Sequence, residues 1–158
     1  MSEVPPELLV YVDPATDPTR QLRGADGRQL TQIVKAAIAD HDYATAWPGG
    51  LPSASELAAN HARAFIVAAT VSKVEVRRTG PRASIECTVA IRISPWYGVD
   101  GGEAWETASA ASATGSARAT TGLRDELIRL GVRDCVLEVG ESVTTQRILP
   151  FLRRVASR

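Results

Sequence analysis

The chain has 158 residues, of which 44% are hydrophobic and 23% are charged, as is typical of one globular domain with its own core. Lysine and arginine together number 18, and so do aspartate and glutamate, so the excess positive charge of a dedicated nucleic-acid binder is missing. No apolar run approaches the roughly 18 residues of a membrane-spanning helix. We therefore expect no nucleic-acid partner and no transmembrane segment.

The predicted single domain spans residues 1–158, with a loose tail over 1–7, a core over 8–152 and a basic tail over 153–158. The first residues have neither the basic segment nor the apolar segment of a signal peptide, so as written the protein is expected in the cytoplasm. If the sequence is a piece whose export signal has been removed, we expect a periplasmic or envelope-associated protein instead.

The first elements form a strand–helix–strand pattern. Residues 8–12 are apolar β-formers, which predicts a strand buried on both faces. Asp26 and Gln29 have the spacing of a capping box, and the apolar residues that follow repeat with helical period, so we expect a helix from Asp26 to about Asp40. A short strand is expected over residues 43–47. Ser53 and Glu56 then form a second capping box, which predicts a short helix ending near His61.

The stretch from Ala64 to Ile93 predicts two long strands joined by a turn at residues 77–82. Apolar and polar residues alternate without interruption from Ser84 to Ser94, which indicates one dry face and one wetter face. In the first strand the apolar positions change parity after Val71. A strand can change its apolar face in this way through one extra residue, so we predict a β-bulge near Ser72 and Lys73, or a strand end that leaves the core there.

Every residue from Thr107 to Gly122 is Ala, Ser, Thr or Gly, apart from Arg118. We favour a third strand, whose small side chains would let a helix approach closely, over a flexible segment. Apolar residues at helical spacing follow from Leu123 onward. Gly131 and Gly140 interrupt this pattern, so one helix with weak points and two shorter helices are both compatible with it. Pro150 is expected to kink or restart the helix.

These elements predict an α/β (α+β) fold. It consists of a mixed sheet with an N-terminal β-α-β unit, a long antiparallel three-strand meander and a C-terminal helix. Cys87 falls on the dry face of its strand, and Cys135 lies within an apolar helical pattern. We interpret both as separate, buried small hydrophobic residues, with a Cys87–Cys135 disulfide as the less favoured alternative.

The sequence contains no recognisable catalytic, metal-binding or phosphate-binding motif, and we expect no cofactor, no metal and no catalytic residue. The candidate partner-binding residues are arginines crowded at the hairpin turn and aromatic residues flanking a glycine-rich loop: Arg77, Arg78, Arg82, Trp96, Tyr97 and Trp105. Aromatic residues and arginine are enriched at protein interfaces. The alternative interpretations are a solvated turn for the arginines and the end of the core for the aromatic residues.

We therefore favour a non-catalytic protein–protein interaction or assembly module, which binds a protein partner or itself as a homo-oligomer. The alternative is a small-molecule-binding domain or enzyme that uses a cleft near Asp13, Asp26 and His41, where the first strand ends. RNA binding through the three arginines of the turn is a third interpretation.

A short helix containing Glu56-Leu57-Ala58-Ala59 leads into the long strand that begins Phe65-Ile66-Val67-Ala68-Ala69-Thr70-Val71. This pattern resembles the amino-terminal domain of TolB and the related domain of curli-secretion and penicillin-binding-protein-activator lipoproteins. The resemblance covers residues 8–152 as a pattern of elements. It implies a non-enzymatic, envelope-associated protein-binding module, and it transfers no residue role.

Overall fold

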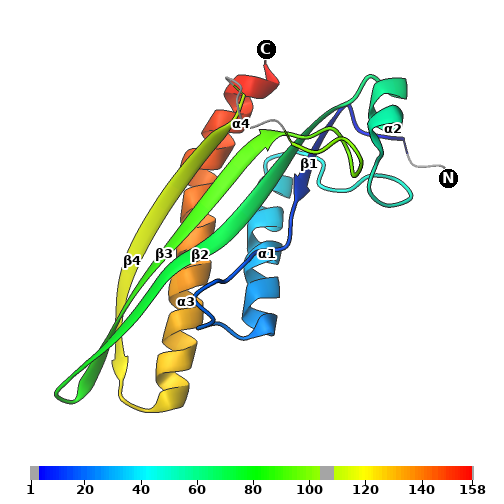
Figure 1. Ribbon diagram of the computed structural model, residues 1–158. Helices are drawn as coiled ribbons and strands as arrows, with labels where there is room; N and C mark the ends of the chain where they lie inside the picture. The colour runs from blue at the N-terminus through cyan, green and yellow to red at the C-terminus, as the bar shows by residue number, and fades with distance from the viewer. Residues whose placement is uncertain (1–3, 104–108, 158) are drawn as a thin grey trace.

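The computed structural model describes residues 4–103 and 109–157, which form a mixed sheet with the longer helices packed along one face (Figure 1). The strands are β1 (Leu8–Val12), β2 (Arg63–Thr79), β3 (Arg82–Pro95) and β4 (Ala111–Gly122). The helices are α1 (Gly24–Ala39), α2 (Ala54–Ala59), α3 (Asp125–Val143), the π-helical turn η1 (Thr144–Ile148) and α4 (Leu149–Ala156). The strand order is β1-β2-β3-β4, with β1 parallel to β2 and the other pairs antiparallel. The predicted fold class is therefore confirmed.

The second strand of the parallel unit is β2 and not the short strand expected over residues 43–47. Within that segment, Ala44 makes a single parallel bridge with Leu9, and its carbonyl accepts the Val10 amide at 2.8 Å. The Pro48-Gly49-Gly50 turn follows directly and bridges back to Trp47, so there is no length for a ladder. The segment instead lies along the outer edge of β1.

The two predicted capping boxes have different outcomes. At α2 the Ser53 Oγ accepts a hydrogen bond from the Glu56 amide at 3.2 Å, and the Glu56 Oε1 accepts one from the Ser53 amide. This capping box is therefore confirmed. The box at Asp26 is wrong, because α1 begins two residues earlier and its N-cap, Arg23, makes no side-chain cap. Asp26 lies inside the first turn, where its carboxylate is 7% exposed and faces the positive end of the helix dipole.

The predicted β-bulge is confirmed in β2. The register between β2 and β3 shifts between Val71 and Lys73, which leaves Ser72 as the extra residue. Because of this one-residue insertion, Val74 and Val76 return to the face that carries Val71 and pack against the main core. The change of apolar parity in the sequence is therefore the signature of the bulge.

Two apolar cores lie on opposite faces of the sheet. The larger core fills the space between all four strands and α1, α3 and α4. The smaller core lies on the other face, at the end of the sheet near α2, and is formed by Leu9, Trp47, Leu57, Ala64, Ile66 and Trp96. It covers β1 and the start of β2 only. The remaining part of that face, over β2, β3 and β4, carries polar side chains.

The stretch of small residues forms β4, as the favoured interpretation predicted, and α3 lies close beneath it. A Cβ atom on Gly115 would come within 2.5 Å of Val143 in α3. Gly131 allows the same closeness from the helix side, since its Cβ would lie 2.6 Å from Ile85 and 2.7 Å from Thr121. Glycine at these positions is therefore required by the packing of the helix against the strands.

The C-terminal helical region is continuous. α3 runs through Gly131 and Gly140 without a break and passes into the π-helical turn η1 directly before Pro150. Proline has no amide proton and its ring crowds the preceding turn, so a change of helical geometry is expected there. α4 then continues past Arg153, the expected start of the basic tail, to Ala156. The Arg63 side chain of β2 donates to the last carbonyls of α4 and fixes its end to the sheet.

Cys87 and Cys135 form a disulfide, so our interpretation of two separate buried cysteines is wrong. Cys87 lies in the middle of β3 and Cys135 in the middle of α3, with their Cα atoms 6.3 Å apart. Both residues are buried, as predicted. The periodicity placed each cysteine on the correct face of its own element, but the bond also depends on which part of α3 packs over β3.

Candidate interaction surface

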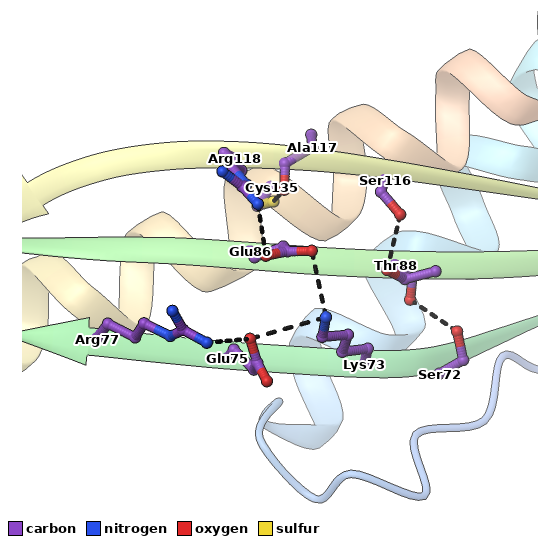
Figure 2. Close-up of polar contacts among 10 residues, drawn as sticks. All are labelled: Ser72, Lys73, Glu75, Arg77, Glu86, Thr88, Ser116, Ala117, Arg118 and Cys135. Atoms are coloured by element: carbon purple, nitrogen blue, oxygen red, sulfur yellow. Dashed lines mark hydrogen bonds and ion pairs between the residues drawn. The ribbon is translucent and has the colours of Figure 1, made fainter.

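The uncovered part of the sheet faces away from α1 and α3 and carries polar side chains from three strands (Figure 2). We call this surface the open face and define it by Ser72, Lys73, Glu75 and Arg77 of β2, Glu86 and Thr88 of β3, and Ser116 and Arg118 of β4. Strict alternation along β3 and β4 produces it, since every second residue points away from the helices. The open face lies beside the smaller core and is not covered by it.

A row of ion pairs crosses the open face, although Glu75 of β2 is the residue directly opposite Glu86 of β3 and Lys73 reaches Glu86 diagonally. Glu86 at its centre pairs with Lys73 at 3.2 Å on one side and with Arg118 at 3.4 Å on the other. Lys73 also reaches Glu75 at 3.7 Å, and Arg77 reaches the same carboxylate at 3.8 Å. The hydrogen bond from Lys73 lowers the pKa of Glu86 below its ordinary value, and the positive charges of Lys73 and Arg118 act in the same direction. This row ends at the edge of the sheet in a positive charge.

A second row crosses the same strands and is built from hydroxyl groups. The Ser72 hydroxyl donates to the Thr88 carbonyl at 3.3 Å, and the hydroxyls of Thr88 and Ser116 lie 2.8 Å apart. Ser116 and Arg118 are alternate residues of β4, so the two rows end on the same face of the edge strand, two residues apart.

The two edges of the sheet differ in how they are protected. The outer edge of β1 is short and carries the Ala44 bridge. β4 pairs with β3 without a register shift from Gly122 to Ala111, and among residues 4–103 and 109–157 no strand pairs with its other side. β4 also has no proline and only one charged residue, Arg118. Natural sheets usually protect such edges with charges, prolines, bulges or short length.

The three predicted arginines lie together at the far end of the β2–β3 hairpin, but on strands rather than in a six-residue turn. The ladder continues to the Thr79–Arg82 pair, so only Gly80 and Pro81 form the turn. Arg77 pairs with Glu75, as described above, and Arg78 lies 3.4 Å from Asp125 at the start of α3. The hairpin end is therefore exposed, with part of its positive charge neutralised.

Two of the predicted aromatic residues, Trp96 and Tyr97, lie at the other end of β3. Trp96 is buried in the smaller core and stacks on Tyr11 with ring centroids 4.8 Å apart, as in the alternative interpretation. Tyr97 is 51% exposed, and Trp105 lies outside the described residues. At about 3.3 Å per residue, the length of β3 separates Tyr97 from Arg82 by roughly 45 Å. The six candidate residues therefore do not form one site.

Tyr97 belongs to an exposed apolar loop cluster that sequence reasoning did not identify. Leu51 and Val99 are 48% and 61% exposed beside it. The loops are joined because the Val99 amide donates to the Pro52 carbonyl at 3.0 Å. A cavity of about 370 Å³ lies nearby, between α2 and the adjoining ends of β2 and β3.

The alternative cleft near Asp13, Asp26 and His41 is not assembled. Asp13 accepts a hydrogen bond from the Tyr11 hydroxyl at 3.1 Å; burial raises the pKa of Tyr11, and the Asp13 contact raises it further. Asp26 lies in the first turn of α1, whereas His41 lies beyond its last turn. At 1.5 Å per residue these two side chains are separated by about 22 Å along the helix axis.

The described residues contain neither a cluster of metal-ligating side chains nor a membrane-spanning helix. Among residues 4–103 and 109–157, no group of three or more histidine, cysteine, aspartate or glutamate side chains is arranged to hold a metal ion. Within the same part of the chain, no helix is long and apolar enough to cross a membrane.

The comparisons with known proteins show a similarity of fold. No family model matches the sequence, and no curated protein matches it. A Xanthomonas campestris protein of the DUF330 family has 14% identity and a TM-score of 0.53, with 99% of this chain and 91% of that chain covered. A Helicobacter pylori homologue of the neuraminyllactose-binding hemagglutinin has 9% identity and a TM-score of 0.52, with 96% of this chain and 90% of that chain covered. A Caulobacter crescentus structure named as a lipoprotein has 11% identity and a TM-score of 0.49, with 94% of this chain and 92% of that chain covered. The architecture of this chain is thus shared with bacterial proteins of widely different sequence.

Proposed function

We propose that the protein is a non-catalytic protein-interaction module of the bacterial envelope, which binds a partner chain through the open face and the adjoining edge of β4. The observation that carries this proposal is the juxtaposition of a polar sheet face with an edge strand of 12 residues, whose outer side pairs with no other strand among residues 4–103 and 109–157. An extended segment of another chain can add to such an edge through main-chain hydrogen bonds, while its side chains contact the neighbouring face. A second copy of the chain is the other protein that this surface could accept.

The envelope location is supported by the Cys87–Cys135 disulfide. Structural disulfides persist in oxidising compartments such as the periplasm, whereas bacterial cytoplasm generally keeps thiols reduced. This chemistry favours the second of the two locations expected from the sequence. The fold, which is shared with the bacterial structures described above, is compatible with the same location.

Site-specific photo-crosslinking in the source cells tests the proposal. A photoreactive phenylalanine derivative in place of Thr114 lies on the exposed side of β4, two residues from Ser116. The matched control carries the same derivative in place of Glu138, which is exposed on α3 at the opposite layer. We expect discrete protein adducts from position 114 and none of the same mass from position 138. Equal adducts from both positions, or no adduct from 114, would contradict the proposal.

A further inference from the structure

We infer that the edge of β4 accepts an extended strand with a carboxylate side chain opposite Arg118 and a hydroxyl side chain opposite Ser116. The inference rests on the proposed function and specifies the chemistry of the partner. It begins with the cross-strand rows of the open face, because side chains that lie directly opposite one another are the units that stabilise a sheet.

The charged row defines the residue that would continue it. Arg118 of β4 lies directly opposite Glu86 of β3 and pairs with it at 3.4 Å, while Lys73 of β2 reaches Glu86 diagonally at 3.2 Å (Figure 2). Arg118 is the last member, and its side chain is 78% exposed. A carboxylate opposite Arg118 on a fourth strand would repeat the Glu86–Arg118 pair on the other side of the arginine, whereas a positive charge there would repel it.

The hydroxyl row defines a second position in the same strand. Thr88 and Ser116 lie directly opposite each other with their hydroxyls 2.8 Å apart, and Ser116 belongs to the edge strand. Cross-strand pairs of serine and threonine stabilise sheets through such contacts. Because Ser116 and Arg118 are alternate residues, the partner strand would present its hydroxyl and its carboxylate two residues apart.

Arg118 also discriminates between an acidic strand and a second copy of β4. It is the only charged side chain on β4, so a second β4 strand supplies no carboxylate opposite Arg118, and antiparallel pairing centred on residue 118 would place the two arginines directly opposite each other. Like charges directly opposite each other destabilise a strand pair. Specific interfaces combine an attractive contact with a repulsive one in this way. We therefore assign the edge to an acidic strand from another protein.

The test compares two synthetic peptides of nine residues, each with capped ends and alternating threonine and valine. One peptide has glutamate and the other has lysine in place of the central threonine. NMR titration of the isotope-labelled, disulfide-intact protein reports which amides shift and yields the dissociation constant. We expect shifts along β4 and about fivefold tighter binding of the glutamate peptide at low salt, with the preference reduced as salt rises.

Two charge-reversal variants define the residue responsible. Arg118→Glu should reverse the preference in favour of the lysine peptide. Arg77→Glu is the matched control, because Arg77 has the same side-chain exposure of 78% on the same face but lies two strands from the edge. It should leave the preference unchanged, and thermal unfolding of both variants verifies their folding. The comparison of peptides on the unmodified protein needs no variant at all.

The inference is overturned by equal affinity for the two peptides, by shifts located away from β4, or by no binding at millimolar peptide. It is also overturned if sedimentation equilibrium shows a dimer that is lost when Thr114 is replaced by proline, because a second copy then occupies the edge. These outcomes are separate from the crosslinking result. Adducts from position 114 without any charge preference would leave the proposed function standing and reject the acidic strand.

Discussion

Removal of the Cys87–Cys135 disulfide should cost much of the stability of the fold. The bond closes a segment with a sequence separation of 48 residues, which includes the end of β3, all of β4 and the first half of α3. In the chain-entropy treatment, a loop of this length restricts the unfolded chain enough to contribute about 4 kcal/mol at 25 °C. Domains of ordinary size have a free energy of unfolding of about 5–15 kcal/mol, so the loss is a large fraction of the total.

The double variant Cys87→Ala/Cys135→Ala provides the measurement, because alanine keeps both buried positions small and apolar. Urea unfolding followed by tryptophan fluorescence should show a free energy of unfolding lower by about 4 kcal/mol than that of the oxidised protein. Trp47 and Trp96 lie in the smaller core and report on its loss. In a phosphine reductant, the free energy of unfolding of the native protein should approach that of the variant. The same reductant should leave the free energy of unfolding of the variant unchanged. An unfolding midpoint that is the same with and without the bond would refute this reasoning.

Three further changes test the packing, the charge row and the α2 cap. Gly115→Ala should lower the free energy of unfolding by about 1–3 kcal/mol in urea titrations, because its Cβ meets α3, whereas Ser116→Ala on the exposed side of the same strand should cost about 0.5 kcal/mol or less. The pKa of Glu86 is lowered in the folded state, so the stability that this carboxylate contributes is present above its unfolded pKa and is lost as the pH falls through its folded pKa. Glu86→Gln should therefore weaken the loss of stability between pH 5 and pH 2, as measured by thermal unfolding. Ser53→Ala should lower the free energy of unfolding by about 1 kcal/mol in urea titrations through loss of the capping box, whereas the same change at Ser112, an exposed position of β4, should cost about 0.5 kcal/mol or less.

Local patterns in the sequence predicted those parts of the fold that are decided locally. The parity change after Val71 is a direct consequence of the bulge, and the alternation from Ser84 to Ser94 is a direct consequence of the pleat. The strand assignment for the small residues before Gly122 was correct because a close helix requires such residues. Each of these features depends on neighbours within a few positions along the chain.

Features that depend on the arrangement of distant elements were not predictable in the same way. Hydrophobic period gives the face on which Cys87 and Cys135 lie, but not the helix position that packs above β3. The spacing of Asp26 and Gln29 fits a capping box, yet α1 already begins at Gly24, with Arg23 as its N-cap residue.

The open face was visible in the sequence only as a wetter side of two strands. That it ends at β4, the edge strand of the described sheet, follows from the strand order, which no local pattern supplies. The candidate arginines and the described candidate aromatic residues, Trp96 and Tyr97, lie at opposite ends of β3 for the same reason.

Hydrogen exchange measured on the protein purified with its bound partner from the source cells tests the central claim most directly. The account predicts that the amides of residues 111–122 exchange more slowly in the complex than in the isolated chain, while those on the exposed side of α3 are unchanged. Slower exchange confined to the helical layer, or to the loop cluster around Tyr97, would contradict it.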